Sequence, residues 1–394
     1  MDAGALSDDL TAEFRQSAMP RDTIAFISTY THPSRDSIER TVREAFPEYR
    51  LENIKTADII RAHREWIAPN LLFVGAEFGA DILAKRASLS ECYRRTTYLF
   101  RHLKTAMREV IDPARHVFSF QTQSMYDTSV PGVPHFLYTD HTHLSNLSSP
   151  YFDRRRLRSQ KWIDLERTIY HNASRVFTRS SDITADVVNH YGVTPDHVAC
   201  VRSGSNIHIP ADFQPANDNY ANKRILFVGS EWERKGGPEL EQAFREVLKV
   251  HPDAHLTIAG VSPRLDLPNC TVLGKVPLQE LTRHYAEASI FCLPTRLEPF
   301  GIVFIEAMLH RLPIVATRTG AVPDMVKQNE TGLLVEPGDA KGLGRALIEL
   351  VGDPARCRRY AETGYRHARE GYTWERVGQR MRENILPFLT SAQR

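Results

Sequence analysis

The feature that most constrains the fold of this chain is the regular alternation of short, continuously apolar runs with longer amphipathic segments. Runs with the composition of buried strands occupy residues 23–28, 70–75, 116–120, 135–139, 175–178 and 198–201 in the first half. In the second half they occupy residues 224–229, 255–260, 290–294, 313–317 and 332–335. Strands that are apolar on both faces and separated by helices form parallel sheets covered on both sides. The pattern therefore predicts an α/β fold with doubly wound sheets.

The alternation is interrupted once, at residues 210–223 (PADFQPANDNYANK), where prolines and asparagines replace the apolar period. A chain of 394 residues is also longer than one hydrophobic core usually organises. We therefore expect two Rossmann-like domains that face each other across a cleft, where ligands of such sheets bind. The expected boundaries are 1–210 for the N-terminal domain, 211–223 for a linker and 224–372 for the C-terminal domain. A helix over 373–394 is expected to pack back toward the N-terminal domain.

The composition excludes several classes of protein. Fifty basic against 48 acidic side chains give a net charge of +2, which disfavours a nucleic-acid-binding domain. The five cysteines are scattered and form no CxxC pair, so we expect neither a disulfide framework nor a zinc site, and a reducing, cytoplasmic location. The acidic N-terminus has no apolar run and is not expected to be a signal peptide. No stretch approaches the ~20 apolar residues of a spanning helix, so we expect any membrane association to be peripheral.

The most informative segment for function is residues 296–308 (RLEPFGIVFIEAM), which follows the expected strand 290–294. A helix is expected to begin near Gly301, and the free N–H groups and positive dipole end of a helix N-terminus suit a phosphate. Glu298, on the loop before the helix, and Glu306, about one and a half turns into it, are placed to accept hydrogen bonds from sugar hydroxyls. A ligand with a diphosphate between two sugars, as in a sugar nucleotide, satisfies both requirements.

A second segment, residues 227–237 (FVGSEWERKGG), joins the expected strand 224–229 to its helix. Glycines beside Arg234 and Lys235 suit a diphosphate, because fixed cations neutralise the charge on a leaving phosphate. The spacing matches neither GxGxxG nor GxxxxGK[ST], so a dinucleotide-binding dehydrogenase and a P-loop nucleotidase are both disfavoured. Each of these residues alone is equally compatible with an ordinary charged turn, and the joint spacing is what favours a donor site.

These segments, with LTIAG, GKVP, PIVATRTGAVPDMV, ETGLLVEPGD and YTWE, resemble the retaining glycosyltransferases of the GT-B fold (family GT4, glycosyl transferases group 1) over residues 224–380. The resemblance implies that Glu298 binds donor-sugar hydroxyls, Glu306 binds the ribose and Lys235 binds the pyrophosphate. It places the donor along the Phe300, Gly301, Ile302 and Val303 backbone, with the base at Val276 and the phosphates at Gly229, Ser230 and Gly236. It also implies transfer with retention and no required metal or other cofactor.

The chain departs from the family at Ser230, where an arginine is common. Arg234, just before Lys235, is the candidate replacement. The N-terminal half resembles the family only loosely, and its first loop (residues 28–34) has no glycine. By position after the expected strand 135–139, His141 matches a family histidine that contacts the donor sugar, with His143 as the second candidate. Gln121 and Gln123, after another strand, are candidate acceptor-binding residues, although polar loop residues commonly have no specific role.

Two basic stretches bear on partners. Residues 85–108 carry seven Lys/Arg and one acid, and residues 151–162 form a second cluster with aromatic neighbours. They predict either peripheral docking to an anionic membrane surface or, equally simply, a solvated face of a sheet-covering helix.

We therefore expect a retaining glycosyltransferase that moves a hexose from a UDP- or GDP-sugar to a hydroxyl of a glycan or glycolipid, with Glu298, His141, Lys235 and Arg234 as catalytic residues. The alternatives are a non-catalytic paralogue that binds a sugar nucleotide or a partner subunit, and a nucleotide-sugar epimerase on the same fold.

Overall fold

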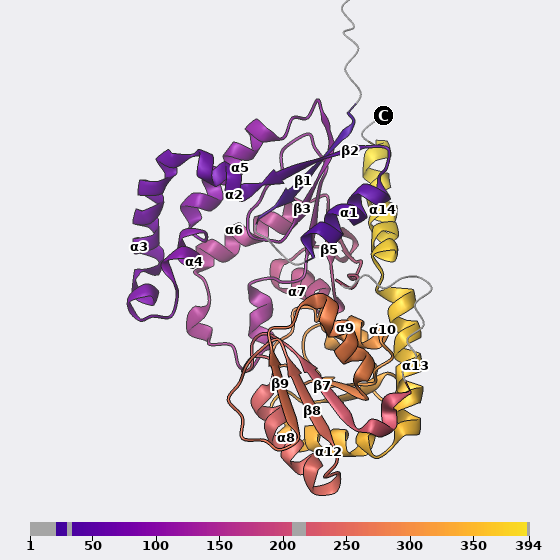
Figure 1. The fold of residues 1–394 in the computed structure, drawn as a ribbon. Helices are drawn as coiled ribbons and strands as arrows, with labels where there is room; N and C mark the ends of the chain where they lie inside the picture. The colour runs from indigo at the N-terminus through magenta and orange to yellow at the C-terminus, as the bar shows by residue number, and fades with distance from the viewer. Residues whose placement is uncertain (1–20, 30–33, 207–217, 392–394) are drawn as a thin grey trace, which may run out of the picture.

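The computed structural model describes residues 21–29, 34–206 and 218–391. It has two α/β domains, each a sheet covered by helices, and Figure 1 shows one above the other. The N-terminal sheet has the strand order β2-β1-β3-β4-β5-β6 and all its neighbours are parallel. Its strands are β1 (Thr23–Ser28), β2 (Arg50–Lys55), β3 (His116–Thr122), β4 (His135–Thr139), β5 (Arg175–Thr178) and β6 (Val198–Cys200).

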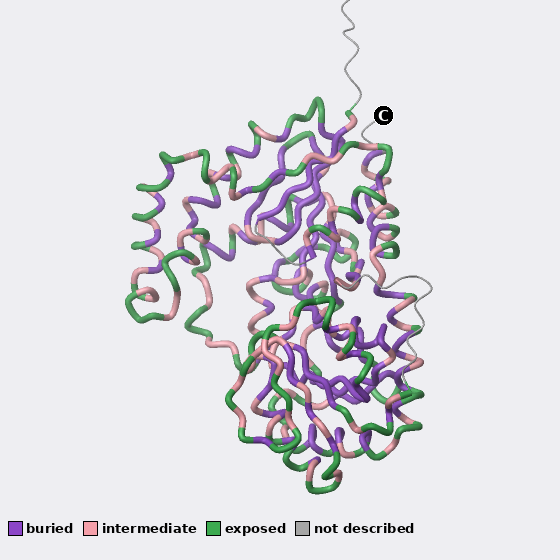
Figure 2. Tube along the Cα trace, in the orientation of Figure 1, coloured by how far each residue is buried: buried purple, intermediate pink, exposed green. Residues whose placement is uncertain are grey.

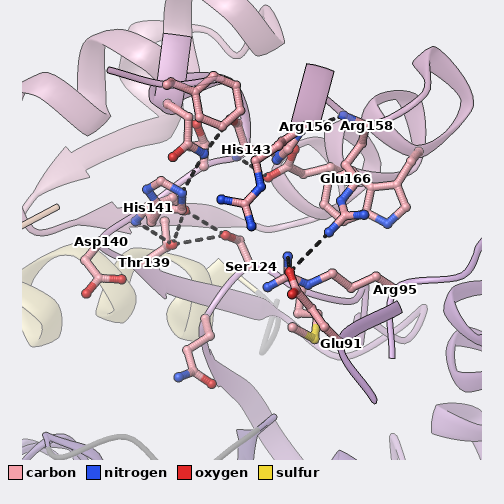
Figure 3. Close-up of a pocket in the computed structure, with 16 residues that line it drawn as sticks. Glu91, Arg95, Ser124, Thr139, Asp140, His141, His143, Arg156, Arg158 and Glu166 are labelled. Carbon is pink, nitrogen blue, oxygen red and sulfur yellow. Dashed lines mark hydrogen bonds and ion pairs between the residues drawn. The ribbon is translucent and has the colours of Figure 1, made fainter. Parts of the chain in front are cut away.

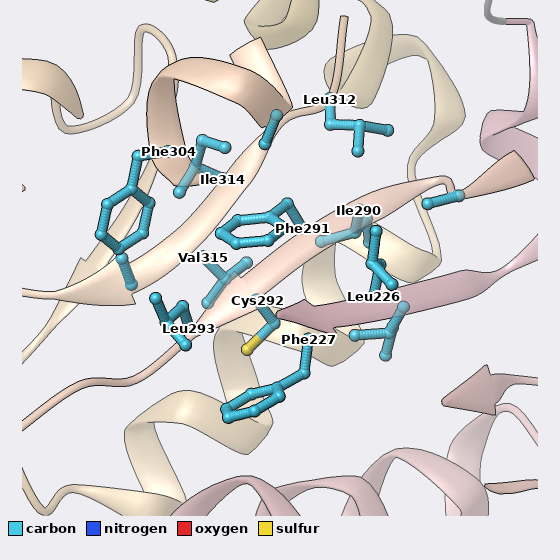
Figure 4. Packing of buried hydrophobic residues seen from close by; sticks show 14 of the residues in the cluster. Leu226, Phe227, Ile290, Phe291, Cys292, Leu293, Phe304, Leu312, Ile314 and Val315 are labelled. Atoms are coloured by element: carbon cyan, nitrogen blue, oxygen red, sulfur yellow. The ribbon is translucent and has the colours of Figure 1, made fainter. Parts of the chain in front are cut away.

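The C-terminal sheet has the order β12-β11-β10-β7-β8-β9 and is also parallel. Its strands are β7 (Arg224–Val228), β8 (His255–Ala259), β9 (Cys270–Gly274), β10 (Ile290–Leu293), β11 (Ile314–Thr317) and β12 (Gly332–Val335). Figure 4 shows the core around β10, where Phe291 and Cys292 are fully buried. The predicted class, α/β with two doubly wound parallel sheets, is confirmed.

Helices cover these sheets. In the first half they are α1 (Arg35–Ala45), α2 (Thr56–Ala62), α3 (Ile67–Leu83), α4 (Leu89–Tyr93), α5 (Thr97–Val110), α6 (Gln160–His171) and α7 (Ser181–Tyr191). In the second half they are α8 (Gly237–Val250), α9 (Leu278–Glu287), α10 (Ile302–Leu309), α11 (Val322–Met325), α12 (Ala340–Val351), α13 (Pro354–Gly371) and α14 (Trp374–Ser391). Residues 211–217 of the predicted linker lie outside the described ranges, as do residues 30–33 of the loop after β1. Within the rest of the predicted linker, Asn219–Asn222 form a short 3-10 helix.

The prediction of a strand at residues 70–75 is wrong, because these residues lie inside α3. The run NLLFVG is apolar in both of its faces, and such a short run does not distinguish a buried strand from a helix. The strand that completes this edge of the sheet is β2, whose residues other than Ile54 are exposed or half-buried and form no continuous apolar run. The edge strand β9 escaped prediction for the same reason.

The expectation that no segment has the length and composition of a spanning helix is also wrong for residues 64–83. This helical stretch has a mean hydropathy of 1.2 over its most apolar window, and only 22% of that window is buried. Length and composition alone do not distinguish a spanning helix from a surface or core helix, and the inward contacts of α3 are described below.

The last helix, α14, returns to the first domain, where it packs beside α1 (Figure 1). Val377, Met381 and Ile385 are buried in one cluster with Ile38 and Val42 of α1. Arg382 donates a hydrogen bond of 2.7 Å to the carbonyl of Ala45. The C-terminal end of the chain thereby completes the core of the N-terminal domain.

The two domains meet through loops that follow the carboxyl ends of their strands. Ser149, after β4, donates a hydrogen bond of 3.2 Å to the carbonyl of Arg296, after β10. The Arg296 guanidinium also lies 4.9 Å from the ring centre of Tyr151. After β5, the amide of Ser181 donates to Asp324 of α11 at 2.6 Å. The edges where open α/β sheets bind ligands therefore face each other.

Candidate functional site

The site on the C-terminal domain is built around the N-terminus of α10. β10 ends at Leu293, and α10 begins at Ile302 after a turn whose last residue, Gly301, has φ of 90°. A side chain at Gly301 would be strained at this φ, and its Cβ would lie 2.7 Å from the Phe304 ring. No side chain caps this helix end. The first N–H groups of α10 have no acceptor within the helix and can bind an anion.

Lys235 and Glu298 form an ion pair beside this helix end, and both side chains are buried. The two loops that carry them are joined by their backbones, since the amide of Arg296 donates to the carbonyl of Arg234 at 2.8 Å. Gly236 lets them come this close, because its Cβ would lie 1.8 Å from the Pro294 carbonyl oxygen. Two residues 63 positions apart, identified separately from sequence, therefore occupy one point of the structure.

Arg234 lies beside this pair. Its guanidinium donates to the carbonyl of Leu297 at 2.8 Å and pairs with Glu231 at 2.7 Å. The hydrogen bonds to Glu231 and the charge of Glu298 raise the pKa of Arg234 against the opposing effect of burial. It is held at the loop that carries Glu298, and it stays cationic. The neighbouring Ser230 is exposed and Gly229 is half-buried.

Glu306 lies deeper in the domain than the other expected donor residues. Its carboxylate accepts a hydrogen bond of 3.1 Å from the Tyr285 hydroxyl and one from the backbone of Asn206. Burial raises the pKa of Glu306 to about 7. The structure does not bring Glu306 to the Lys235–Glu298 pair, and its assignment to a ribose stays a prediction.

The remaining expected donor residues are apolar. Phe300 is buried, with its ring centre 6.4 Å from that of Tyr372. Ile302, Val303 and Val276 are half-buried and packed against the core of the C-terminal domain. These residues define the walls near α10 and the end of β9 without offering a polar side chain, so only their backbones can recognise a ligand's polar groups.

The site on the N-terminal domain is a cavity of about 310 Å³ at the carboxyl ends of β3 and β4. His141 and Asp140 lie on one side of it, and Glu91 and Arg95 on the other (Figure 3). Arg156 also contributes to its wall. The cavity therefore holds both acidic and basic side chains that come from segments far apart in the sequence.

His141 has a hydrogen-bond partner at each ring nitrogen. Nε2 lies 3.0 Å from the Asn146 amide nitrogen, and Nδ1 lies 3.1 Å from the Ser145 hydroxyl. Because the Asn146 amide nitrogen can only donate, Nε2 accepts and the proton resides on Nδ1. Burial lowers the pKa of His141, although the charge of Asp140 opposes this. The imidazole is therefore neutral and fixed in orientation.

His143, the second histidine candidate, serves the local structure. Its Nε2 accepts a hydrogen bond of 2.9 Å from the backbone N–H of Arg158, and its ring meets the edge of Trp162. Burial and the positive charge of Arg158 lower the pKa of His143 to about 3. The backbone N–H of His143 donates a hydrogen bond of 2.9 Å to the Glu166 carboxylate, and burial raises the pKa of Glu166 to about 7.

The two glutamine candidates differ in position. Gln121 is buried within β3, and its amide donates to the carbonyls of Gln123 and Tyr126 at 2.7 and 2.8 Å. It is not part of the cavity wall, because these internal bonds use its amide group to hold the loop after β3. Gln123 does line the cavity, with a φ of 73°.

Three arginines in this cavity were not identified as site residues from the sequence: Arg95, Arg156 and Arg158. Arg95 lies 2.9 Å and Arg158 3.4 Å from the same Glu91 carboxylate. They belong to the two basic stretches, residues 85–108 and 151–162, for which we expected either membrane docking or a solvated surface. Nothing in the linear spacing shows that these stretches converge. Within the described ranges, no three His, Cys, Asp or Glu side chains are grouped to hold a metal.

The whole chain is similar in fold to solved glycosyltransferases of the GT-B class. A sucrose-phosphate synthase of Thermosynechococcus elongatus superposes with a TM-score of 0.67 at 17% identity, covering 94% of this chain and 100% of that one. The glycosyltransferase WaaG, involved in lipopolysaccharide biosynthesis, superposes with a TM-score of 0.62 at 14% identity, covering 92% and 99%. The protein therefore has the GT-B fold.

The C-terminal domain matches a known family. Residues 222–353 match the family described as glycosyl transferases group 1. A GDP-mannose-dependent monoacylated alpha-(1-6)-phosphatidylinositol monomannoside mannosyltransferase of Corynebacterium glutamicum is 34% identical over 170 residues, covering 39% of this chain and 44% of that protein. A D-inositol 3-phosphate glycosyltransferase of Corynebacterium aurimucosum is 27% identical over 266 residues, covering 60% of each. The matches thus span about half the length of these relatives.

Proposed function

We propose that the protein is a retaining glycosyltransferase that transfers a hexose from a nucleotide-diphosphate sugar to a hydroxyl of a glycan or glycolipid, in polysaccharide or glycolipid biosynthesis. The observation that carries this proposal is the buried Lys235–Glu298 pair beside the uncapped N-terminus of α10. A cation, free N–H groups and a carboxylate at one point match a ligand that is anionic at its phosphates and rich in hydroxyls at its sugar.

In this proposal the diphosphate lies against the N-terminus of α10, and Lys235 leaves Glu298 to contact it. Glu298 then accepts hydrogen bonds from donor-sugar hydroxyls. Arg234 and Lys235 stabilise the negative charge that develops on the leaving phosphate as the glycosidic bond breaks. The acceptor oxygen bonds to the anomeric carbon on the same face, and its proton passes to the leaving phosphate oxygen. No metal or other cofactor takes part.

The neutral His141 is proposed to contact the donor sugar from the N-terminal side. A neutral imidazole brings no second positive charge to the reacting centre. The base and sugar are proposed as a uridine or guanosine diphosphate hexose. A relative named as GDP-mannose-dependent and a similar fold solved in complex with UDP and glucose support these two choices.

We place the reaction in the cytoplasm. If the acceptor is a lipid, the reaction takes place at the inner face of the membrane. The five free cysteines support a reducing compartment.

The first test is a thermal-shift panel of UDP, GDP, ADP and their hexose conjugates, followed by NMR of the incubated donor. A ligand at 100 times its dissociation constant stabilises the protein by about 2.7 kcal/mol. We expect one nucleotide series to raise the melting temperature, and slow release of the hexose with its anomeric configuration retained. No shift with any nucleotide would contradict the proposal.

Two other outcomes distinguish the alternatives. Conversion of the donor hexose into another hexose without acceptor would identify an epimerase. Nucleotide binding with neither hydrolysis nor transfer, and no effect of Glu298→Ala on partner binding, would identify a non-catalytic paralogue.

A further inference from the structure

A second cavity, of about 900 Å³, lies at the carboxyl ends of β1, β2 and β3, beneath α2, α3 and α4. Apolar side chains form most of its wall: Ala57, Ile60, Leu71, Leu89, Tyr93 and Met125. Thr29 and Thr56 also line it, and within the described residues their buried hydroxyls have no hydrogen-bond partner. A cavity of this size and polarity suits the apolar part of a ligand.

This apolar cavity adjoins the arginine-containing cavity described above. Met125 lines both of them. Between them lies α4, which turns Leu89 and Tyr93 to the apolar cavity, while Glu91 and the following Arg95 line the other one. The two cavities therefore form neighbouring compartments along one edge of the N-terminal sheet.

The strand order shows how the two cavities lie relative to the C-terminal domain. The apolar cavity lies at β2, β1 and β3, the arginine cavity at β3 and β4, and the contacts with the C-terminal domain follow β4 and β5. A ligand that occupies both compartments would have its apolar part farthest from the donor domain. Its charged part would lie beside His141.

The helix α3 forms the surface next to the apolar cavity, and its exposed face is apolar. Figure 1 places α3 at the outer edge of the N-terminal domain, and Figure 2 shows that its outer side is exposed. The exposed residues of this helix are Ile67, Ala68, Leu71, Leu72, Gly75, Ala76, Ala80 and Leu83. Leu72 is 76% and Leu83 86% exposed. No charged side chain lies on this face.

The charged residues of α3 instead make contacts with the protein. Glu77 accepts a hydrogen bond of 3.0 Å from the amide of Thr97, and Asp81 pairs with Arg86 at 2.8 Å. A helix whose polar groups bind the protein while its leucines meet solvent requires another apolar phase to cover it.

The basic side chains around α3 indicate which apolar phase covers its exposed face. Arg64 precedes α3, Lys85 follows it, and Arg94 lies at the mouth of the apolar cavity; all three are exposed. Within the described residues none of the three has an acidic side chain within 4.0 Å. Unpaired cations bordering an apolar face complement an anionic lipid surface. Leu71 belongs both to the exposed face and to the cavity wall, so the cavity is continuous with that surface.

We propose that the acceptor is an anionic lipid, with its hydrocarbon chain in the apolar cavity and its anionic head group at Arg95, Arg156 and Arg158. The exposed face of α3 rests in the lipid surface from which this acceptor is drawn. As an assignment of acceptor class, this inference rests on the proposed function.

Calorimetry with dodecyl phosphate, butyl phosphate and the uncharged dodecyl maltoside, below their critical micelle concentrations, tests the cavity. Each buried methylene is worth about fourfold in affinity, so burial of only three or four of the additional methylenes makes dodecyl phosphate bind about 100-fold more tightly than butyl phosphate. Ala57→Phe, which fills the cavity, removes this preference, whereas Ala62→Phe, exposed on the same helix, keeps it. Arg95→Gln weakens both phosphates about tenfold. Equal affinity for the two chain lengths, or for phosphate and maltoside, would overturn the proposal.

Co-sedimentation with vesicles tests the surface. We expect binding to phosphatidylglycerol vesicles, at least tenfold weaker binding to phosphatidylcholine vesicles, and a tenfold or larger loss in Leu72→Glu. Val250→Glu, at an aliphatic position of the C-terminal domain that is 56% exposed, serves as the control and binds as the native protein does. Binding without dependence on lipid charge, or a solution dimer that Leu72→Glu dissociates, would overturn the proposal.

The nucleotide thermal-shift panel, run on the same variants, separates this inference from the proposed function. Nucleotide binding without any chain-length preference would reject the lipid acceptor and leave the donor assignment standing. Chain-length preference without nucleotide binding would reject the glycosyltransferase and leave a lipid-binding cavity.

Discussion

Lys235 and Glu298 form a buried ion pair that supplies both a cation and a carboxylate to the proposed binding site. Both side chains are buried, and each serves as the other's counter-ion. Removing one partner leaves the other charge buried and uncompensated, which costs about 3–5 kcal/mol in comparable pairs. Each charge therefore depends on the other within the fold, and the pair suits a ligand that brings its own anion and hydroxyls.

A double-mutant cycle with Lys235→Met and Glu298→Gln measures this coupling. We expect the free energy of unfolding to fall in each single variant, and the double variant to lose about 1–3 kcal/mol less than their sum. The exposed pair Lys223–Asp253, at 2.8 Å, is the control and should couple by less than about 1 kcal/mol. Additive losses at Lys235 and Glu298 would show that the two charges do not interact.

Glu306 gives a prediction about pH. Burial raises its pKa to about 7 from 4.5, so folding takes up a proton between these values and stability falls as pH rises from about 4.5 to about 7. Glu306→Gln cannot ionise. Denaturant unfolding at several pH values should show the variant gaining on the native protein across this window, by roughly 3 kcal/mol at most. Parallel pH profiles would contradict a buried, raised carboxyl at this position.

At the scale of elements, two glycines differ in whether the structure requires a glycine at that position. Gly301 ends the turn before α10 with φ of 90°, and its Cβ would meet Phe304. Gly75 lies exposed within α3, and its Cβ would meet nothing within 4 Å. One is needed for a backbone conformation beside the site, and the other leaves the helix weaker than alanine would.

The same substitution is therefore expected to act in opposite directions. Gly301→Ala should destabilise the protein by about 1–3 kcal/mol and weaken nucleotide binding, because a left-handed conformation costs an alanine this much. Gly75→Ala should stabilise it by up to about 1 kcal/mol. Thermal unfolding and nucleotide titration of both variants measure this, and equal effects on stability would contradict the structure at Gly301.

The elements also show what the sequence could and could not predict. The central strands and the turn before α10 were predictable, because continuous apolar runs and the EPFG segment are local signals. The edge strands β2 and β9 and the helix α3 were not, because an exposed strand has no apolar run and an outward apolar face imitates a buried strand. The Lys235–Glu298 contact was predictable only through resemblance. The convergence of Arg95, Arg156 and Arg158 depends on tertiary packing between segments that no local spacing connects.

At the scale of the molecule, the last described helix packs in the same domain as the first described strand. α14 follows the whole C-terminal domain in sequence, yet Ile385 is fully buried in the N-terminal core. The loops after the strands of both domains touch at Ser149–Arg296 and Ser181–Asp324. The Lys235–Glu298 pair and the His141 cavity are thus held on facing edges of two separately packed cores.

Truncations in the two cores test this division. Ile385→Ala and Leu347→Ala each remove a fully buried aliphatic side chain and should cost about 2–5 kcal/mol. By hydrogen exchange, Ile385→Ala should lower the protection of α1, and Leu347→Ala that of α8. Loss of protection in α8 from Ile385→Ala alone would contradict the placement of α14.

The central claim is that a diphosphate binds at the N-terminus of α10. The most direct test is a crystal structure with whichever of UDP or GDP stabilises the protein. We predict phosphate oxygens within hydrogen-bond distance of the Ile302 and Val303 amides and of Lys235 Nζ, with Lys235 displaced from Glu298. A nucleotide bound elsewhere, with the Lys235–Glu298 pair unchanged, would contradict the account.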